Sequence, residues 1–133
     1  MAEPVPQPVN DPQVLAELRA AFERYERALT ANDVPVLIEM FRDSPETVRY
    51  GVGENLYGAE AIARFRRERP TGPFRRRLMN TVITSYGRDM GVTSTEYMRE
   101  GHDRPGRETK VFLRTDAGWK VVAAHVSLLG ETV

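Results

Sequence analysis

Arg49 is the residue whose surroundings raise the first chemical question. It lies in "PETVRYGVGENLYG", residues 45–58, between Val48 and Tyr50. In a strand, alternation places the Arg49 side chain on the face opposite to Val48 and Tyr50. Three interpretations are open: a solvated strand face, an internal salt bridge, or the wall of a cavity that needs a positive charge.

Tyr25 and His125 are candidates for chemistry in apolar surroundings. Tyr25 belongs to a run of apolar residues at spacings of three and four, which is typical of the buried stripe of a helix. It can be a core aromatic with its hydroxyl at the rim, or a proton donor. His125 lies in the apolar segment "VAAHVSLL", residues 122–129. A neutral buried imidazole with one hydrogen-bond partner competes there with a catalytic role.

Several common catalytic motifs do not occur. The sequence has no cysteine, which excludes disulfides and thiolate chemistry. Its two histidines, His102 and His125, lie far apart and have no metal-ligand spacing. The string "GVGENLYG", residues 51–58, lacks the order of a nucleotide-binding loop, and no serine lies in a nucleophile elbow. We therefore expect no metal and no cofactor.

An arginine cluster covers residues 64–77, "RFRRERPTGPFRRR", with seven arginines. Such a cluster can be a nucleic-acid patch, or a solvated helix end followed by a strand edge that discourages aggregation. The whole chain has 19 basic and 19 acidic residues, so its net charge does not favour a polyanion. We expect a solvated cluster and no nucleic-acid partner.

The elements that would position these residues are three helices and then a run of strands. Asp11 and Asp33 are suitable N-caps for the first two helices, and "TDAG" with Gly118 indicates a tight hairpin. Helices followed by antiparallel strands define an α+β class. The expected helices cover residues 11–33, 34–41 and 58–69, and the strands after the one at Arg49 cover residues 76–86, 91–99, 108–115 and 118–129.

The last predicted strand is apolar on both faces, which suggests that both are covered. Helices would cover one face and a second subunit the other, so we expect a homodimer. By strict alternation, one face carries Trp119, Val121 and Ala123, and the other carries Val122, Ala124 and Val126.

The 133 residues are enough for one domain, expected over residues 11–133. Residues 1–10 contain Pro4, Pro6 and Pro8 and predict a flexible, extended arm. No apolar run approaches the ~20 residues of a membrane span, and the N-terminus does not read as a secretory signal. We therefore expect a cytoplasmic protein without a membrane partner.

Four strings identify a family resemblance: "FERYERAL" at 22–29, "TVRYGVGENLYG" at 47–58, "TVITSYGRD" at 81–89 and "VAAHVSLL" at 122–129. With them the chain resembles the AtzH and HpxZ family, associated with cyanuric acid and oxalurate catabolism. This family belongs to the SnoaL-like branch of the nuclear-transport-factor-like superfamily. The resemblance implies a cone-shaped α+β barrel, in which a strongly curved antiparallel sheet wraps around N-terminal helices and leaves a pocket. It also implies dimers formed through the outer face of the sheet.

The resemblance further implies an enzyme that converts 1,3-dicarboxyurea to allophanate, with the two necessary residues at Tyr25 and Arg49. In this hypothesis, Arg49 binds a substrate carboxylate through two parallel hydrogen bonds. Tyr25, with its pKa lowered by a nearby guanidinium, gives a proton to the leaving nitrogen or holds a water. Glu54, Asn55 and His125 are further candidates for the pocket.

Residue types leave open whether the reaction is a hydrolysis or a decarboxylation. Two alternatives to an enzyme also remain. The chain could be a non-catalytic ligand carrier or sensor that uses the same pocket. It could also be an accessory subunit that docks on a pathway amidase.

Overall fold

The structure is a computed structural model that describes residues 8–69 and 72–130. Helices dominate the N-terminal half and strands the C-terminal half, so the predicted α+β class is confirmed. The helices are α1 (Pro12–Ala31), α2 (Val34–Glu39) and α3 (Ala59–Glu68). The strands are β1 (Val48–Tyr50), β2 (Asn55–Tyr57), β3 (Arg76–Tyr86), β4 (Met90–Arg99), β5 (Gly106–Thr115) and β6 (Gly118–Leu128).

Both predicted N-caps are present. The Asp11 carboxylate accepts hydrogen bonds of 3.1 Å and 3.3 Å from the backbone N–H groups of Gln13 and Val14, at the start of α1. Asp33 accepts one of 3.3 Å from the N–H of Val36, at the start of α2. Each bond satisfies a donor that the first helical turn cannot satisfy itself, which is worth about 1 kcal/mol.

One six-stranded sheet, in the order β2-β1-β6-β5-β4-β3, curves around the helices without closing into a barrel. Strands β3 to β6 form an antiparallel meander, as predicted. Two features were not predicted: β2 is a separate strand, and β1 pairs in parallel with β6, with Arg49 opposite Ala124. This parallel pairing makes β1, with Arg49, an inner strand between β2 and β6.

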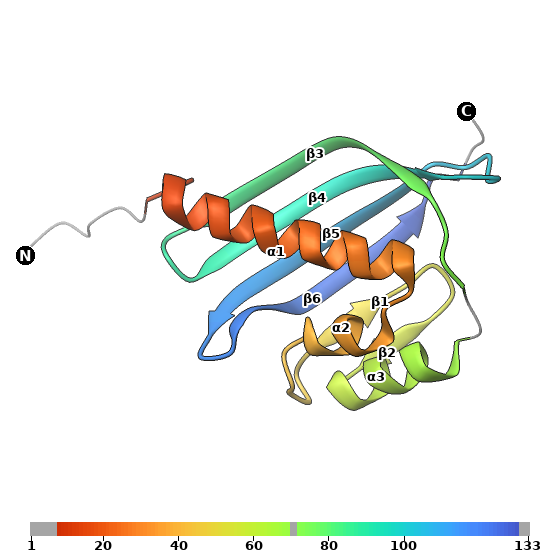
Figure 1. Cartoon of the computed structure of the whole chain (residues 1–133), viewed down its shortest axis with the longest axis horizontal. Coiled ribbons are helices and arrows are strands. Elements are labelled where there is room, and N and C mark those ends of the chain that lie inside the picture. The colour runs from red at the N-terminus through yellow and green to blue at the C-terminus, as the bar shows by residue number, and fades with distance from the viewer. Residues whose placement is uncertain (1–7, 70–71, 131–133) are drawn as a thin grey trace, which may run out of the picture.

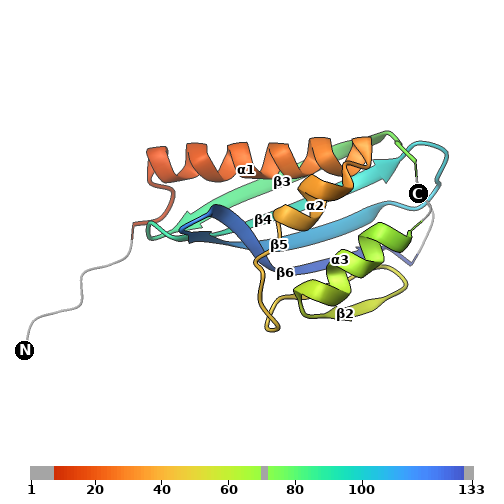
Figure 2. The same ribbon diagram turned by 60° about the horizontal axis from the view of Figure 1, so that its bottom comes forward.

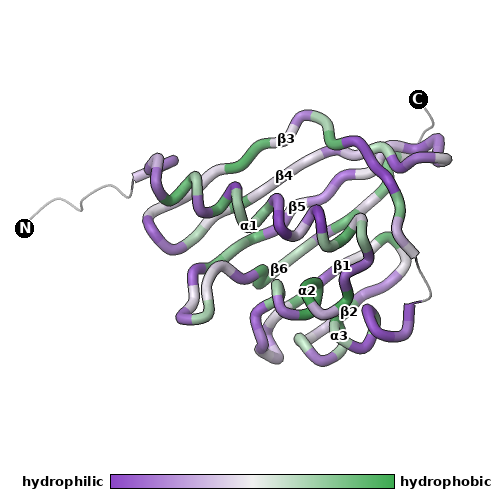
Figure 3. The backbone as a smooth tube through the Cα atoms, viewed as in Figure 1, coloured by the Kyte–Doolittle hydropathy of each residue, from purple (hydrophilic) through white to green (hydrophobic). Residues whose placement is uncertain are grey.

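The helices share one face of the sheet, and α1 crosses the strands diagonally (Figures 1 and 2). The core between these layers includes Leu18, Leu37, Phe112 and Val121, all with an exposed fraction of 0%. Each such side chain contributes about 1.5–3 kcal/mol by leaving water. Figure 3 shows hydrophilic chain along the second half of α3 and at the start of β3, where the arginine cluster lies.

The predicted facing of the last strand is wrong, because a register shift interrupts it. Phe112 pairs with Val121, whereas its neighbour Val111 pairs with Ala123, so β6 has one extra residue. Val121 and Ala124 are consequently both buried, although strict alternation puts them on opposite faces. No described segment covers the outer face of the sheet.

The predicted flexible arm, residues 1–10, falls largely outside the described residues. Its last three residues are bound to the sheet: the N–H of Asn10 donates to the Ser85 carbonyl at 3.0 Å, and the N–H of Gly87 donates to the Pro8 carbonyl at 2.8 Å. Among the described helices, none has both the length and the apolar character that crossing a membrane requires.

Candidate functional site

A cavity of about 260 Å³ lies between the helices and the concave face of the sheet. This volume is below the ~300 Å³ at which pockets for drug-sized ligands begin, so the cavity suits a small molecule. Side chains from α1, β1, α3, β3, β4, β5 and β6 converge on it. The wall consists of Tyr25, Leu29, Asn32, Arg49, Val52, Glu54, Arg66, Arg69, Phe74, Arg76, Tyr97, Arg99, His102, Arg104, Glu108, Val126 and Leu128.

The wall is strongly cationic. It contains six arginines and two glutamates, although the whole chain is neutral. A concave, partly apolar wall with an excess of one charge concentrates ligands of the opposite sign. The charge of the wall therefore favours small anions over small cations.

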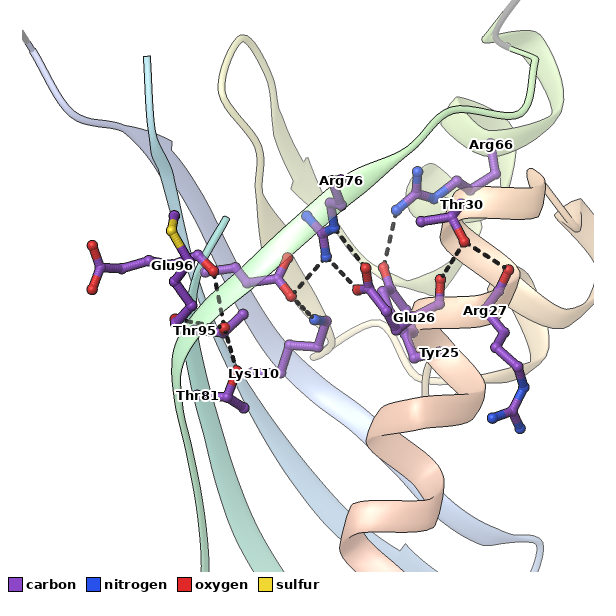
Figure 4. Close-up of polar contacts among 12 residues, drawn as sticks. Tyr25, Glu26, Arg27, Thr30, Arg66, Arg76, Thr81, Thr95, Glu96 and Lys110 are labelled. Carbon is purple, nitrogen blue, oxygen red and sulfur yellow. Dashed lines mark hydrogen bonds and ion pairs between the residues drawn. The ribbon is translucent and has the colours of Figure 1, made fainter. Parts of the chain in front are cut away.

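Tyr25 lies at the centre of this arrangement. It is 3% exposed, and its hydroxyl accepts a hydrogen bond of 3.0 Å from Nη2 of Arg66 (Figure 4). Burial alone raises the pKa of Tyr25, but the nearby cations Arg66, Lys110 and Arg49 outweigh burial and hold the pKa below its ordinary value of 10.0. The expected lowering is confirmed, with Arg66 as its strongest cationic cause.

Arg49 also faces the cavity, and it is 6% exposed, so a solvated strand face is wrong. Its Nη1 donates to Oε1 of Glu54 at 2.7 Å, so Arg49 also forms an internal salt bridge. Oε2 of Glu54 accepts a 3.2 Å hydrogen bond from the N–H of Gly53, which orients the carboxylate. A Cβ atom at Gly51 would overlap the Glu54 carboxylate, so the glycine leaves the space for this pair.

The expectation of a fully solvated arginine cluster is wrong for two of its members. Arg64 and Arg67 are exposed, but Arg66 is 4% exposed and the Arg76 side chain 3% exposed. Arg66 follows Ile62 by four positions and therefore shares the buried face of α3. This spacing is the signal in the sequence that could have identified Arg66.

A buried ionic network borders Tyr25 on the sheet side (Figure 4). Arg76 donates to Glu26 at 2.8 Å and 2.6 Å, and to Glu108 at 3.1 Å. Glu108 also accepts a 2.6 Å hydrogen bond from Nζ of Lys110, which lies 4.4 Å from the centre of the Tyr25 ring. The alternation of β5 places Glu108 and Lys110 on the same face as the buried Phe112, and this alternation is the signal in the sequence that could have identified them.

The structure does not bring all candidates into the cavity. Glu54 joins Tyr25 and Arg49 in the wall, but Asn55 and His125 are exposed and do not line it. His125 packs edge-on against Tyr50 at 5.7 Å, because β6 turns it to the outer face of the sheet. His102 lines the cavity instead, from the loop between β4 and β5.

The described residues contain no cluster of three or more histidine, aspartate or glutamate side chains that could hold a metal ion. The chemistry of the described cavity wall is that of guanidinium, carboxylate, phenol and imidazole groups. This set can bind anions and transfer protons.

Comparisons with known proteins agree with this fold. A model of the AtzH-like family matches residues 7–132. A protein of unknown function in the DUF3225 family from Pectobacterium atrosepticum is 54% identical, with 92% of this chain and 95% of that chain covered and a TM-score of 0.89. A cystatin-like fold protein from Burkholderia xenovorans is 41% identical, with 93% and 98% covered and a TM-score of 0.89.

A more distant NTF2-like protein of unknown function from Pseudomonas putida is 20% identical, with 86% of each chain covered and a TM-score of 0.73. No curated protein matches the chain. The chain belongs to the AtzH-like family, and its fold is that of the NTF2-like proteins.

Proposed function

We propose that the chain is an enzyme that removes a carboxyl group from a small N-carboxylated urea, converting 1,3-dicarboxyurea to allophanate in nitrogen catabolism. The observation that carries the proposal is the Tyr25 hydroxyl, which is buried in an arginine-lined cavity and bound to Arg66 at 3.0 Å. Membership of the AtzH-like family supports the substrate class. The excess of arginine in the wall suits a substrate that carries carboxylates.

Arg49 binds one substrate carboxylate in this proposal. A guanidinium has five N–H donors in a fixed plane, and Glu54 engages Nη1. Glu54 thereby holds the plane of the guanidinium while other donors remain for a ligand. A guanidinium held in one plane fixes the orientation of the bound carboxylate and so positions the scissile bond. Such positioning raises the rate of the reaction.

Tyr25 supplies the proton. The bond between the urea nitrogen and the carboxyl carbon breaks, the electron pair stays on nitrogen, and nitrogen takes the phenolic proton while the carbon leaves as CO₂. The tyrosinate that forms is stabilised by Arg66 and Lys110, and solvent returns the proton. If water attacks the carboxyl carbon instead, bicarbonate leaves and the same nitrogen receives the proton.

Carbon-13 NMR of carboxyl-labelled 1,3-dicarboxyurea tests the proposal. Catalytic amounts of protein should accelerate loss of the labelled carboxyl signal above the spontaneous rate. Tyr25→Phe should lower kcat by ~10²-fold or more, because it removes only the hydroxyl. Arg49→Lys should raise KM and lower kcat/KM, because an ammonium does not replace the planar fork.

Matched controls are Tyr86→Phe, at an exposed position of β3, and Arg42→Lys, at an exposed position after α2. Both should retain wild-type kinetics, and thermal melts should show that all four variants are folded. Binding without turnover would make the chain a carrier, and activity that requires an added amidase would make it an accessory subunit. Full activity of folded Tyr25→Phe would remove the proton donor from the mechanism.

A further inference from the structure

Three guanidinium groups of the cavity wall gather around one aromatic ring. The Cζ atoms of Arg49, Arg66 and Arg69 lie 5.3 Å, 5.8 Å and 5.3 Å from the centre of the Phe65 ring. All three arginines line the cavity. Like charges this close repel one another, so the group needs compensating anions.

The described chain supplies one carboxylate to these three cations. Glu54 pairs with Arg49 at 2.7 Å, and no described carboxylate forms an ion pair with Arg66 or Arg69. The Phe65 ring attracts cations, but it has two faces and cannot offset three guanidinium groups. The pKa of Arg69 is lowered, first by burial and then by Arg66 and Arg49, which is a sign of the same excess charge.

Arg66 shows the shortage most clearly. It is 4% exposed, and its Nε is buried without a hydrogen-bond partner among the described residues. Its Nη2 is bound to the Tyr25 hydroxyl, which is a weaker partner than a carboxylate. Burying a cation without an anion is costly, so an anion from outside the chain would stabilise this site.

We propose that Arg66 and Arg69 form a second carboxylate subsite next to Arg49, so that the cavity selects small dianions over monoanions. This inference rests on the proposed function in that it concerns the same cavity and substrate class. A dicarboxylated substrate engages both subsites with its two carboxylates. A product that has lost one carboxylate engages only one subsite and leaves.

Isothermal titration calorimetry with two stable probes tests the subsite. Glutarate has two carboxylates separated by three carbons, as many atoms as separate those of 1,3-dicarboxyurea, and its half-amide glutaramate has the same shape with one carboxylate. Wild-type protein should bind glutarate at least ~10-fold more tightly than glutaramate. Arg66→Gln and Arg69→Gln should each lower glutarate affinity toward that of glutaramate and leave glutaramate affinity nearly unchanged.

Arg67→Gln is the matched control, because Arg67 is an exposed residue of the same helix. It should keep the wild-type preference for glutarate. Arg69→Gln keeps the test valid if Arg66→Gln fails to fold, because Arg69 is only partly buried. Equal affinity of wild-type protein for the two probes, or a preference that survives in folded Arg66→Gln and Arg69→Gln, would overturn the proposal.

The probes do not react, so the test is independent of turnover. A protein that prefers glutarate but converts no carboxylated urea would retain the subsite and lose the proposed catalysis. A protein that converts the urea but does not prefer glutarate would retain the catalysis and lose the subsite.

Discussion

The phenolic oxygen of Tyr25 lies 3.0 Å from Nη2 of Arg66, although 41 positions separate the two residues in the chain. α1 provides the phenol and α3 the guanidinium, and both groups are buried at the wall of one cavity. This contact joins the proton donor of the proposed reaction to the proposed second carboxylate subsite. It also helps to hold the pKa of the Tyr25 phenol below the ordinary value of a tyrosine.

The stability of the protein should depend on the ionisation of Tyr25. Its pKa is lowered in the folded state from 10.0, so between the folded pKa and 10.0 the unfolded chain binds more protons. The free energy of unfolding of wild-type protein, relative to that of Tyr25→Phe, should therefore rise as the pH approaches 10. The stability gained from the ionised Tyr25 should be lost as the pH falls through the folded pKa. Urea unfolding of both proteins at pH 7 and at about pH 9.5 measures the difference.

Catalysis should show the opposite pH dependence. The proposed proton transfer needs the neutral phenol, so kcat/KM should fall as the pH rises through the folded pKa of Tyr25. Tyr86→Phe, at an exposed position, should change neither pH profile. A stability difference between wild-type protein and Tyr25→Phe that stays constant from pH 7 to about pH 9.5 would contradict the lowered pKa.

Glu108→Gln should destabilise the fold by about 3–5 kcal/mol, because it leaves Lys110 buried without its carboxylate. Arg76 would keep Glu26 as a partner. Chemical denaturation measures the loss, and the double variant Glu108→Gln with Lys110→Met should recover much of it, since both charges are then removed. Glu96→Gln, on the outer face of β4, should have a small effect, and an equal loss in both single variants would show that burial of the ion pair is not the cause.

Glu108 should also contribute to acid sensitivity. Burial raises the pKa of Glu108, but Lys110 and Arg76 outweigh burial and lower it below 4.5. The stability from Glu108 is therefore present above the unfolded pKa and lost as the pH falls through the folded value. The free energy of unfolding of wild-type protein should therefore fall relative to that of the double variant Glu108→Gln with Lys110→Met as the pH falls through this range. Unfolding of both proteins at pH 6 and at about pH 3 measures the change.

Gly51→Ala should impair the site more than Gly53→Ala. A Cβ atom at Gly51 would overlap the Glu54 carboxylate and crowd Nη1 of Arg49, whereas one at Gly53 would meet no atom within 4 Å. If Glu54 is displaced, it no longer holds the Arg49 guanidinium in place, so kcat/KM of Gly51→Ala should fall by ~10-fold or more. Steady-state kinetics with thermal melts checks this, and equal kinetics of the two variants would show that the Glu54–Arg49 pair does not position the substrate.

The protein should form a homodimer through the outer face of its sheet. Tyr86, Met90 and Leu113 lie in register across β3, β4 and β5, with exposed fractions of 47%, 40% and 36%. An apolar row on an uncovered sheet face favours association. Light scattering should give twice the 15.1 kDa of one chain. Leu113→Glu should shift the mass toward the monomer, Arg64→Glu on α3 should not, and a wild-type mass near that of one chain would contradict the dimer.

The sequence by itself determined the features that depend on neighbouring residues. The caps Asp11 and Asp33, the three helices, and the bounds of β3 follow from local hydrogen bonding and from periodicity. Tyr25 and Arg49 were recognisable because each is a polar group among apolar neighbours. Their functional roles came from the family resemblance, since the pattern alone left Tyr25 as a core aromatic or a proton donor. The structure places both side chains in one cavity.

Only the tertiary structure decided which other side chains join them. Arg66 and Arg76 are buried while Arg64 and Arg67 of the same cluster are exposed, because the packing of α3 against α2, β1 and β2, and of β3 against α1, determines which of these chemically identical side chains face the interior. His125 was misplaced for a related reason. Successive side chains of a strand point to opposite faces, so one extra residue in β6 exchanges the faces of all the residues that follow it. The register shift opposite Val111 and Phe112 depends on the pairing of β6 with β5, which local sequence does not determine.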